Sequence, residues 1–196
     1  MDATQLNKEL IHFIYRLLFL FIIEERGLVY QIPDSPDAPD YKQLCQWQDI
    51  YKKFYAASRL RHLSELAYLK QPQYSDLWQG LMDTFHLFEP DTFGEKLGIK
   101  PLGGVLFGTE TLHWLKQCQV SNRDLLAAFA ALNEFTDERQ QRVKINYSSL
   151  DVEEFGSVYE GILEMRPFVQ PGVAASDWQF GFVGGLDRQS TSSYYT

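Results

Sequence analysis

Apolar residues recur at helical spacing along much of the chain, and the first such segment is the longest. From residue 6 to 26 the pattern predicts a helix, and Gly27 stands where a left-handed residue would end it. Residues 14–23 read IYRLLFLFII, which is shorter than the ~20 apolar residues that cross a bilayer. This run contains Arg16 and is followed by EER. We therefore expect a buried helix and no membrane contact.

Two further helices are predicted between residues 41 and 88. Prolines and aspartates fill residues 32–40 and predict a loop. The next helix is expected over 41–68, where the sequence QPQYS interrupts the pattern. Another helix begins near Ser75, a candidate N-cap, and its apolar positions are Leu77, Leu81, Phe85 and Phe88.

The last two helices carry N-terminal capping signals. Ser121 is followed three residues later by Asp124, and Asp151 is followed by Glu154, a spacing that resembles the capping box. The Gly/Pro-rich stretch 90–110 reads as a connector with at most one short strand, and 142–150 as a strand or extended piece.

These elements together predict the fold class. We expect a mainly α protein: an irregular helical bundle with a few short strands and an extended C-terminal tail. No strong period survives after Pro167. The predicted division is therefore a helical domain over 1–166 and a different, loosely packed or extended segment over 167–196.

Composition narrows the function classes. The 196 residues carry a formal charge of −8 and a pI near 5.0, which argues against a surface dedicated to phosphate backbones. The only cysteines, Cys45 and Cys118, cannot form a disulfide framework, so a reducing cytoplasm is the natural location.

Motifs for autonomous catalysis are missing. Pro90 and Asp91 resemble the start of a metal-dependent nuclease motif, but Glu95 and Lys96 are adjacent and would diverge. No nucleophile elbow, phosphate-binding loop or dinucleotide fingerprint is present. Four histidines are scattered without ligand spacing: His12, His62, His86 and His113. We therefore predict no catalytic and no metal-binding residue.

One predicted helix interleaves basic and aromatic residues in the sequence YKKFYAASRLRHL. Such a pattern can follow a nucleic-acid backbone, and its basic members are Lys52, Lys53, Arg59 and Arg61. The alternative, a solvated helix face with aromatic residues in the core, explains the same pattern.

The sequence FGSVYEGILE, residues 155–164, places two glycines inside a predicted helix. Gly156 and Gly161 each cost about 1 kcal/mol relative to alanine. We expect this cost to be tolerated because another backbone approaches closely, either within the chain or in a further part of the protein.

Nearly the whole chain resembles the region upstream of the catalytic domain in large bacterial adenine-specific DNA methyltransferases. These enzymes belong to type IIG-like restriction–modification and related phage-defence systems. The segments that carry the resemblance, in order, are FIYRLLFLFIIEERGL, YSDLWQGL, LGGVLF, SNRDLLAAFAAL, VKINYSSLDVEEFGSVYEGILE and RQSTSSYYT. The most specific are EEFGSVYEGILE and the tail.

The tail resembles a segment that opens the methyltransferase domain and shapes the pocket for the methionine end of S-adenosylmethionine. Ser192 replaces the usual glycine, and the proline that follows in the family would come after Thr196. The matching positions are Arg188, Thr191, Ser193, Tyr194, Tyr195 and Thr196. The resemblance thus implies S-adenosylmethionine contacts for the last three, and a chain cut inside the first motif of the catalytic domain.

The methyltransferase chemistry itself is not encoded in these residues. The family's Asn/Asp-Pro-Pro-Tyr/Phe motif, which holds a flipped adenine, is absent, as is a Gly-rich turn after a strand. The expected function is therefore a non-catalytic region that positions the catalytic domain of a parent methyltransferase and contacts DNA through it. On its own the chain is expected to bind no cofactor. The alternative is a free-standing helical module that binds a protein partner.

Overall fold

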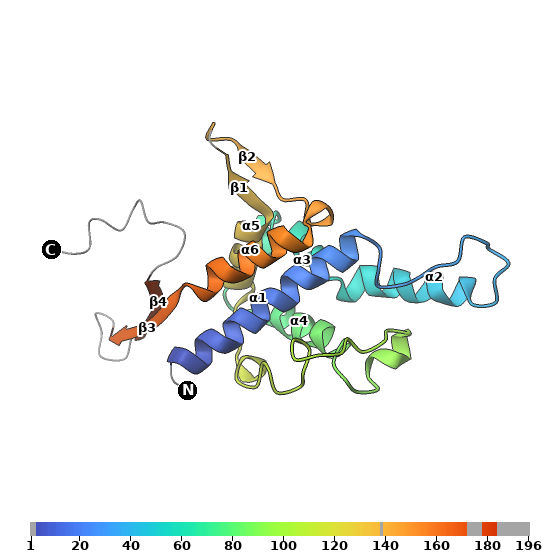
Figure 1. Cartoon of the computed structure of the whole chain (residues 1–196), viewed down its shortest axis with the longest axis horizontal. Coiled ribbons are helices and arrows are strands. Elements are labelled where there is room, and N and C mark those ends of the chain that lie inside the picture. Colours follow the sequence, from blue (N-terminus) through green and yellow to red (C-terminus); the bar gives the residue numbers. More distant parts are fainter. Residues whose placement is uncertain (1–2, 138, 172–177, 184–196) are drawn as a thin grey trace.

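The computed structural model describes residues 3–137, 139–171 and 178–183. Within these ranges, six α-helices and two short antiparallel hairpins are joined by turns of 3₁₀ helix and irregular segments (Figure 1). The helices are α1 (Ala3–Glu25), α2 (Tyr41–Ile50), α3 (Ala57–Leu63), α4 (Asp76–His86), α5 (Asn122–Asn133) and α6 (Val152–Leu163). The strands are β1 (Glu134–Thr136), β2 (Arg142–Lys144), β3 (Arg166–Pro171) and β4 (Trp178–Val183). The prediction of a mainly α protein is confirmed.

Helix α1 is the centre of the molecule, and the other helices lie around it (Figure 1). It ends as predicted, because Gly27 adopts a φ of 67°. Phe13 stacks on Trp78 of α4, with ring centroids 5.4 Å apart, and Phe21 meets Phe129 of α5 edge to face at 5.9 Å. No helix in the described ranges has both the length and the apolar character needed to cross a bilayer.

Polar side chains of α1 fasten the irregular segments to it. The Glu9 carboxylate, 1% exposed as a residue, accepts the backbone N–H groups of Trp114 and Leu115, both at 2.9 Å. About two helical turns after Glu9, the fully buried Arg16 donates to the 106–111 loop. Buried charges are tolerated when their hydrogen bonds are complete, so Glu9 and Arg16 hold the end of the Gly/Pro-rich connector and the segment after it against α1.

The helix predicted over 41–68 is interrupted, so this prediction was wrong in detail. After α2 the backbone forms a π-helical turn, Tyr51–Tyr55, and then leaves the helical region at Ala56, with φ −53° and ψ 127°. Backbone N–H and C=O groups that lose their helical hydrogen-bond partners at this break bond to side chains from other helices. The Thr84 hydroxyl donates to the Tyr55 carbonyl at 2.6 Å, and the Glu24 carboxylate accepts from the first residues of α3. Tertiary contacts therefore outweigh local helical preference.

Helix α4 begins after Ser75 as predicted, but its cap comes from a different residue. The Ser75 side chain makes no capping bond. The Asn122 side chain of α5 accepts the Leu77 N–H at 3.2 Å and donates to Asp76 at 2.8 Å. The α5 cap is as predicted, with Ser121 accepting the Asp124 N–H at 3.2 Å. One amide side chain thus joins the N-terminal ends of two helices.

The hairpins lie in the second half of the chain. Strands β1 and β2 pair with Phe135 opposite Val143, so only the start of the extended piece predicted at 142–150 is a strand. Strands β3 and β4 are antiparallel, and their pairing begins with Arg166 opposite Val183. Periodicity had indicated no such hairpin after residue 166. The two strands shorten the stretch that was predicted to be irregular.

Helix α6 has the predicted capping box, since Asp151 and Glu154 each accept the other's backbone N–H, at 2.8 and 3.0 Å. The expected close approach at Gly156 is not found: a Cβ added there would meet nothing within 4 Å among the described residues. The Gly161 residue is buried. Close packing against any other described residue therefore does not explain Gly156.

Candidate functional site

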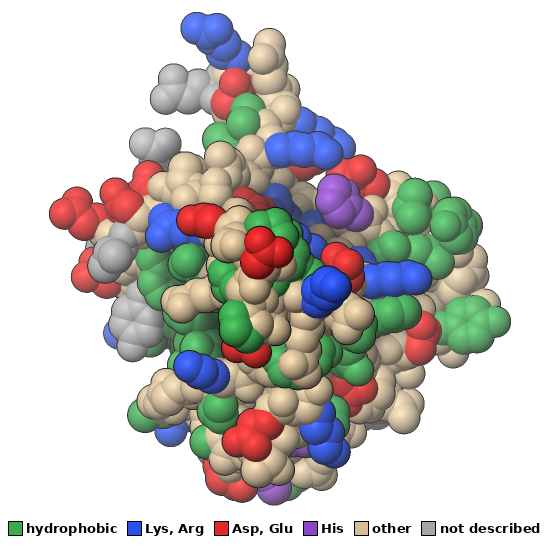
Figure 2. All heavy atoms as spheres, turned by 90° about the vertical axis from the view of Figure 1, so that its right-hand side faces the viewer, with side chains coloured by type: hydrophobic (Ala, Val, Ile, Leu, Met, Phe, Trp, Pro, Cys, Tyr) green, Lys and Arg blue, Asp and Glu red, His purple; other side chains and the backbone are tan. Residues whose placement is uncertain are grey.

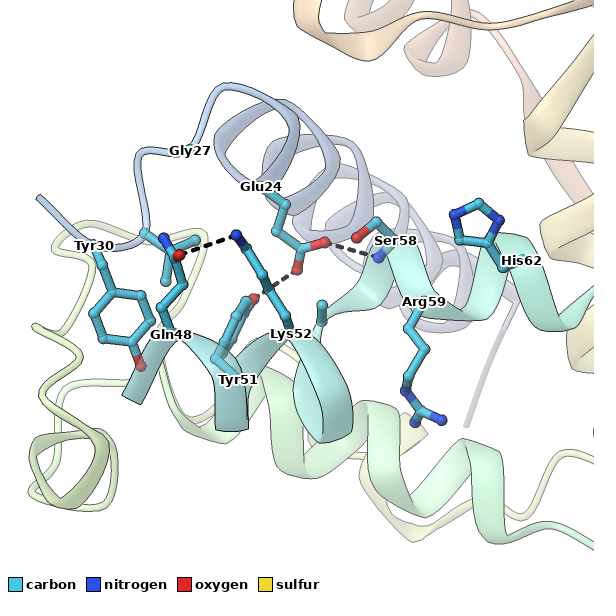
Figure 3. Close-up of a pocket in the computed structure, with 11 residues that line it drawn as sticks. Glu24, Gly27, Tyr30, Gln48, Tyr51, Lys52, Ser58, Arg59 and His62 are labelled. Carbon is cyan, nitrogen blue, oxygen red and sulfur yellow. Dashed lines mark hydrogen bonds between the residues drawn. The ribbon is translucent and has the colours of Figure 1, made fainter. Parts of the chain in front are cut away.

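A pocket of about 280 Å³ opens where the interrupted helix passes the C-terminal end of α1 (Figure 3). It exists because the break at Ala56 turns the chain away between the π-helical turn and α3. Its polar wall combines side chains from α1, α2, the π-helical turn and α3: Glu24, Gln48, Tyr51, Lys52, Ser58, Arg59 and His62. Two of these side chains, Lys52 and Arg59, are cationic, against the one carboxylate of Glu24.

The Glu24 carboxylate organises the pocket. It accepts the Tyr51 hydroxyl at 2.6 Å and the N–H groups of Ala57 and Ser58, each at 2.8 Å. It therefore serves as the N-terminal cap of α3, supplied from α1. Burial raises the pKa of the Glu24 carboxyl, and these hydrogen bonds oppose that rise. Burial, followed by the charge of Glu24, raises the pKa of the Tyr51 hydroxyl well above its usual range.

The four basic residues predicted to contact DNA do not share one environment. Lys52 and Lys53 are exposed; the Lys52 ammonium donates to Gln48 at 3.0 Å, and that of Lys53 lies 5.1 Å from the centre of the Phe54 ring. Arg59 is partly buried, which lowers its pKa, and it donates to the Phe54 carbonyl at 3.2 Å. Lys52 and Arg59 thus line the pocket, whereas Lys53 does not.

Arg61 is held inside the fold, so the structure removes it from the predicted surface. Its side chain is only 13% exposed and donates to Asn133, to Glu25 and, at 2.7 Å, to the Ile145 carbonyl. Its guanidinium also lies 4.7 Å from the centre of the Tyr147 ring. The reason is packing: the basic helix face on which Arg61 lies is covered by α5 and by the segment after β2.

The face at the α2 end shows basic and acidic side chains interspersed (Figure 2). Such a surface has no extended field of one sign and cannot bind nucleic acid by charge alone. Any phosphate contact would depend on the few residues around the pocket. The exposed aromatic ring of Phe54, 54% accessible, lies among them.

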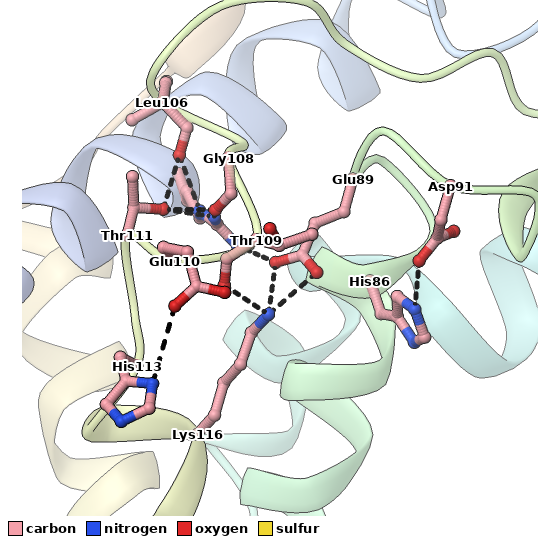
Figure 4. A network of polar contacts seen from close by, with 11 residues as sticks. His86, Glu89, Asp91, Leu106, Gly108, Thr109, Glu110, Thr111, His113 and Lys116 are labelled. Carbon is pink, nitrogen blue, oxygen red and sulfur yellow. Dashed lines mark hydrogen bonds and ion pairs between the residues drawn. The ribbon is translucent and has the colours of Figure 1, made fainter.

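A second polar cluster surrounds Glu89 (Figure 4). Glu89 Oε1 accepts from Arg16 at 2.8 Å and from Lys116 at 2.7 Å. Arg16 also donates to the carbonyls of Leu106 and Gly108, each at 2.8 Å, and to the Thr111 hydroxyl at 2.6 Å. This network joins α1, the turn that follows α4 and the 106–116 segment, and its buried charges are compensated.

His86, Glu89 and Asp91 bring possible ligand atoms within 4.8 Å of one another. Glu89, however, is already paired with two cationic side chains. His86 Nε2 lies 2.5 Å from Asp91, whose other oxygen accepts the Phe93 N–H at 2.8 Å. A metal ion would have to displace these partners while being repelled by Arg16 and Lys116. The cluster is better explained as a structural network than as a metal centre.

The S-adenosylmethionine contacts implied for Tyr194, Tyr195 and Thr196 lie outside the described residues. Conversely, sequence reasoning missed Glu24, Tyr51 and Ser58. The sequence did contain one signal for Glu24, a glutamate in the last turn of a long apolar helix. A negative charge is unfavourable both on an apolar helix face and at the C-terminal end of a helix dipole, so such a residue needs a specific partner.

No protein-family model, curated protein or solved structure matches the chain.

Proposed function

We propose that this chain is the non-catalytic helical region of a site-specific adenine DNA methyltransferase, of the restriction–modification or phage-defence type. The observation that carries the proposal is the ordered resemblance over nearly the whole chain, above all in EEFGSVYEGILE. The paired caps of α6, on which that segment lies, suit a helix that must begin at a fixed residue. In the parent protein this region would orient the catalytic domain in the cytoplasm.

S-adenosylmethionine belongs to the parent protein in this proposal. Concave burial of most of a ligand is what gives affinity, and residues 194–196 alone would supply one edge of such a site. The isolated 196-residue chain is therefore expected neither to bind the cofactor nor to methylate DNA. Calorimetric titration of the chain with S-adenosylmethionine tests this, and saturable micromolar binding would contradict it.

The DNA contact is proposed for the pocket, which Lys52 and Arg59 line, together with Lys53, the exposed neighbour of Lys52 in the chain. Changing both lysines to alanine in the parent should weaken DNA binding at every sequence tested. In a plot of the logarithm of the binding constant against the logarithm of the salt concentration, the slope should become less steep by about one unit for each phosphate contact that is lost. Lys100→Ala, at an exposed lysine outside the π-helical turn that carries Lys52 and Lys53, is the control. Equal affinities for the double variant and the control would remove this face from the DNA interface.

The alternative is a free-standing helical module that binds a protein partner. Exposed apolar side chains at the α6 end favour a protein-binding role. The reading frame discriminates the two: a methyltransferase domain encoded directly after Thr196 supports the first, and a stop codon there supports the second.

A further inference from the structure

Exposed apolar side chains gather around α6. Val105, 75% exposed, and Leu163, 50% exposed, line the same groove of about 590 Å³ beside the N-terminal half of α1. Ile11 of α1 and Phe155 of α6 line it too. Apolar side chains that are exposed singly need no explanation, but those that share a groove indicate a binding surface.

The β3–β4 hairpin extends this apolar surface. Val169 and Val183 are 42% and 50% exposed. Arg166, the residue that pairs with Val183, follows Leu163 by only three positions. Figure 1 shows α6 running alongside α1 and the hairpin beside the N-terminal end of α1. We call the groove, α6 and the hairpin together the α6 face.

The charge on the α6 face is mainly negative, although Lys8 of α1 also lines the groove. The segment from Asp151 to Arg166 contains five carboxylates and one arginine. Asp151 and Glu154 are used in the capping box, while Glu153, Glu160 and Glu164 are exposed. A partner that fits this face would present apolar side chains within a basic rim, since complementary charge selects and orients an interface.

We infer that the α6 face is the docking surface for the domain that follows residue 196 in the parent protein; this inference rests on the proposed function. The elements of the face lead directly into the last described strand, which ends at Val183. Residues 184–196 can span at most about 45 Å when fully extended. A domain tethered within that reach has an effective concentration in the millimolar range. A groove of modest size is therefore sufficient to hold it.

Hydrogen exchange on the parent and on the 196-residue chain provides the first test. Amides of α6 and of the 105–106 segment should exchange at least ten-fold more slowly in the parent, because docking removes solvent and restricts opening. Amides of α4 serve as the internal control, since the core around them is the same in both proteins.

Two substitutions in the parent provide the second test. Val105→Asp and Leu163→Asp each put a charge into the groove at a position exposed in this chain, so folding of the 196-residue chain should be unaffected and its melting temperature unchanged. In the parent, proteolysis within residues 184–196 should become at least five-fold faster and methylation of DNA at least five-fold slower. Tyr68→Asp, at a residue 70% exposed and outside the groove, should change neither.

The outcomes separate the two proposals. A parent that methylates DNA, but shows equal exchange of α6 in both proteins and no effect of the groove variants, overturns the docking inference and leaves the proposed function standing. A reading frame without a methyltransferase domain overturns both. Protection of the groove that grows with the concentration of the 196-residue chain would identify a second copy as the occupant and would also overturn docking of the following domain.

Discussion

Removing the Arg16 guanidinium should destabilise the fold more than any exposed substitution on the same helix. In Arg16→Met, the volume is largely kept while four hydrogen bonds are lost, to Glu89, to the Leu106 and Gly108 carbonyls and to Thr111. Breaking a buried ion pair by removing one partner costs about 3–5 kcal/mol. Lys116 still neutralises Glu89, so we expect a value near 3 kcal/mol. With a urea slope of about 2 kcal/mol per M, the midpoint should fall by about 1.5 M.

Urea unfolding followed by circular dichroism and by tryptophan fluorescence measures this change. Arg26→Met is the matched control, because Arg26, the residue directly after α1, also donates to two backbone carbonyls but is exposed, and should cost less than 1 kcal/mol. In a double-mutant cycle, adding Glu89→Leu to Arg16→Met should cost less than Glu89→Leu alone. An Arg16→Met midpoint equal to that of wild type, or strict additivity with Glu89, would refute the view that this network holds the 106–111 loop.

Three further predictions concern the pocket, a glycine and a cap. Burial raises the Glu24 pKa above its usual 4.5, so the stability of wild type relative to Glu24→Gln should be greatest below about pH 4 and fall as the pH rises through the folded-state pKa. Urea midpoints of both proteins from pH 4 to 7 check this, and a difference that is independent of pH would contradict it. Gly98→Ala should lower the free energy of unfolding by about 1–3 kcal/mol, because φ is 65° at this residue and the new Cβ would lie 2.3 Å from the Trp47 ring. An unchanged melting temperature would argue against that packing. Asp151→Ala should lower the free energy of unfolding by about 1 kcal/mol, because it removes the capping box with Glu154. Thermal unfolding measures this change, and no change is expected if the start of α6 is frayed in the wild-type protein.

The sequence predicted the parts of the fold that depend on short-range signals. The α1 stop at Gly27 and the caps at Ser121 and Asp151 all appear where the pattern indicated. Each involves residues within four positions of one another, so local sequence contains the whole of the interaction.

What the sequence did not reveal depends on contacts between distant segments. The break at Ala56 is stabilised by Glu24 and Thr84, which lie more than 25 residues away on either side. The inward turn of Arg61 likewise depends on Asn133 and on the Ile145 carbonyl. The pocket and its basic rim follow from these contacts. Helical periodicity alone therefore placed four basic residues on one surface, although the fold uses one of them internally.

The position of α1 in the order of synthesis has a consequence for how the protein reaches its fold. Hydrogen bonds from α1 and from Arg26, which directly follows it, join residues 95, 106 and 124 positions apart: Arg16 to Thr111, Glu9 to Leu115 and Arg26 to Leu150. Ribosomes add about 5–20 residues per second. The apolar helix would therefore leave the exit tunnel many seconds before its last partner is made. During that interval the nascent chain presents an apolar surface to its surroundings, and a chaperone that binds such surfaces would have its target within the first 25 residues.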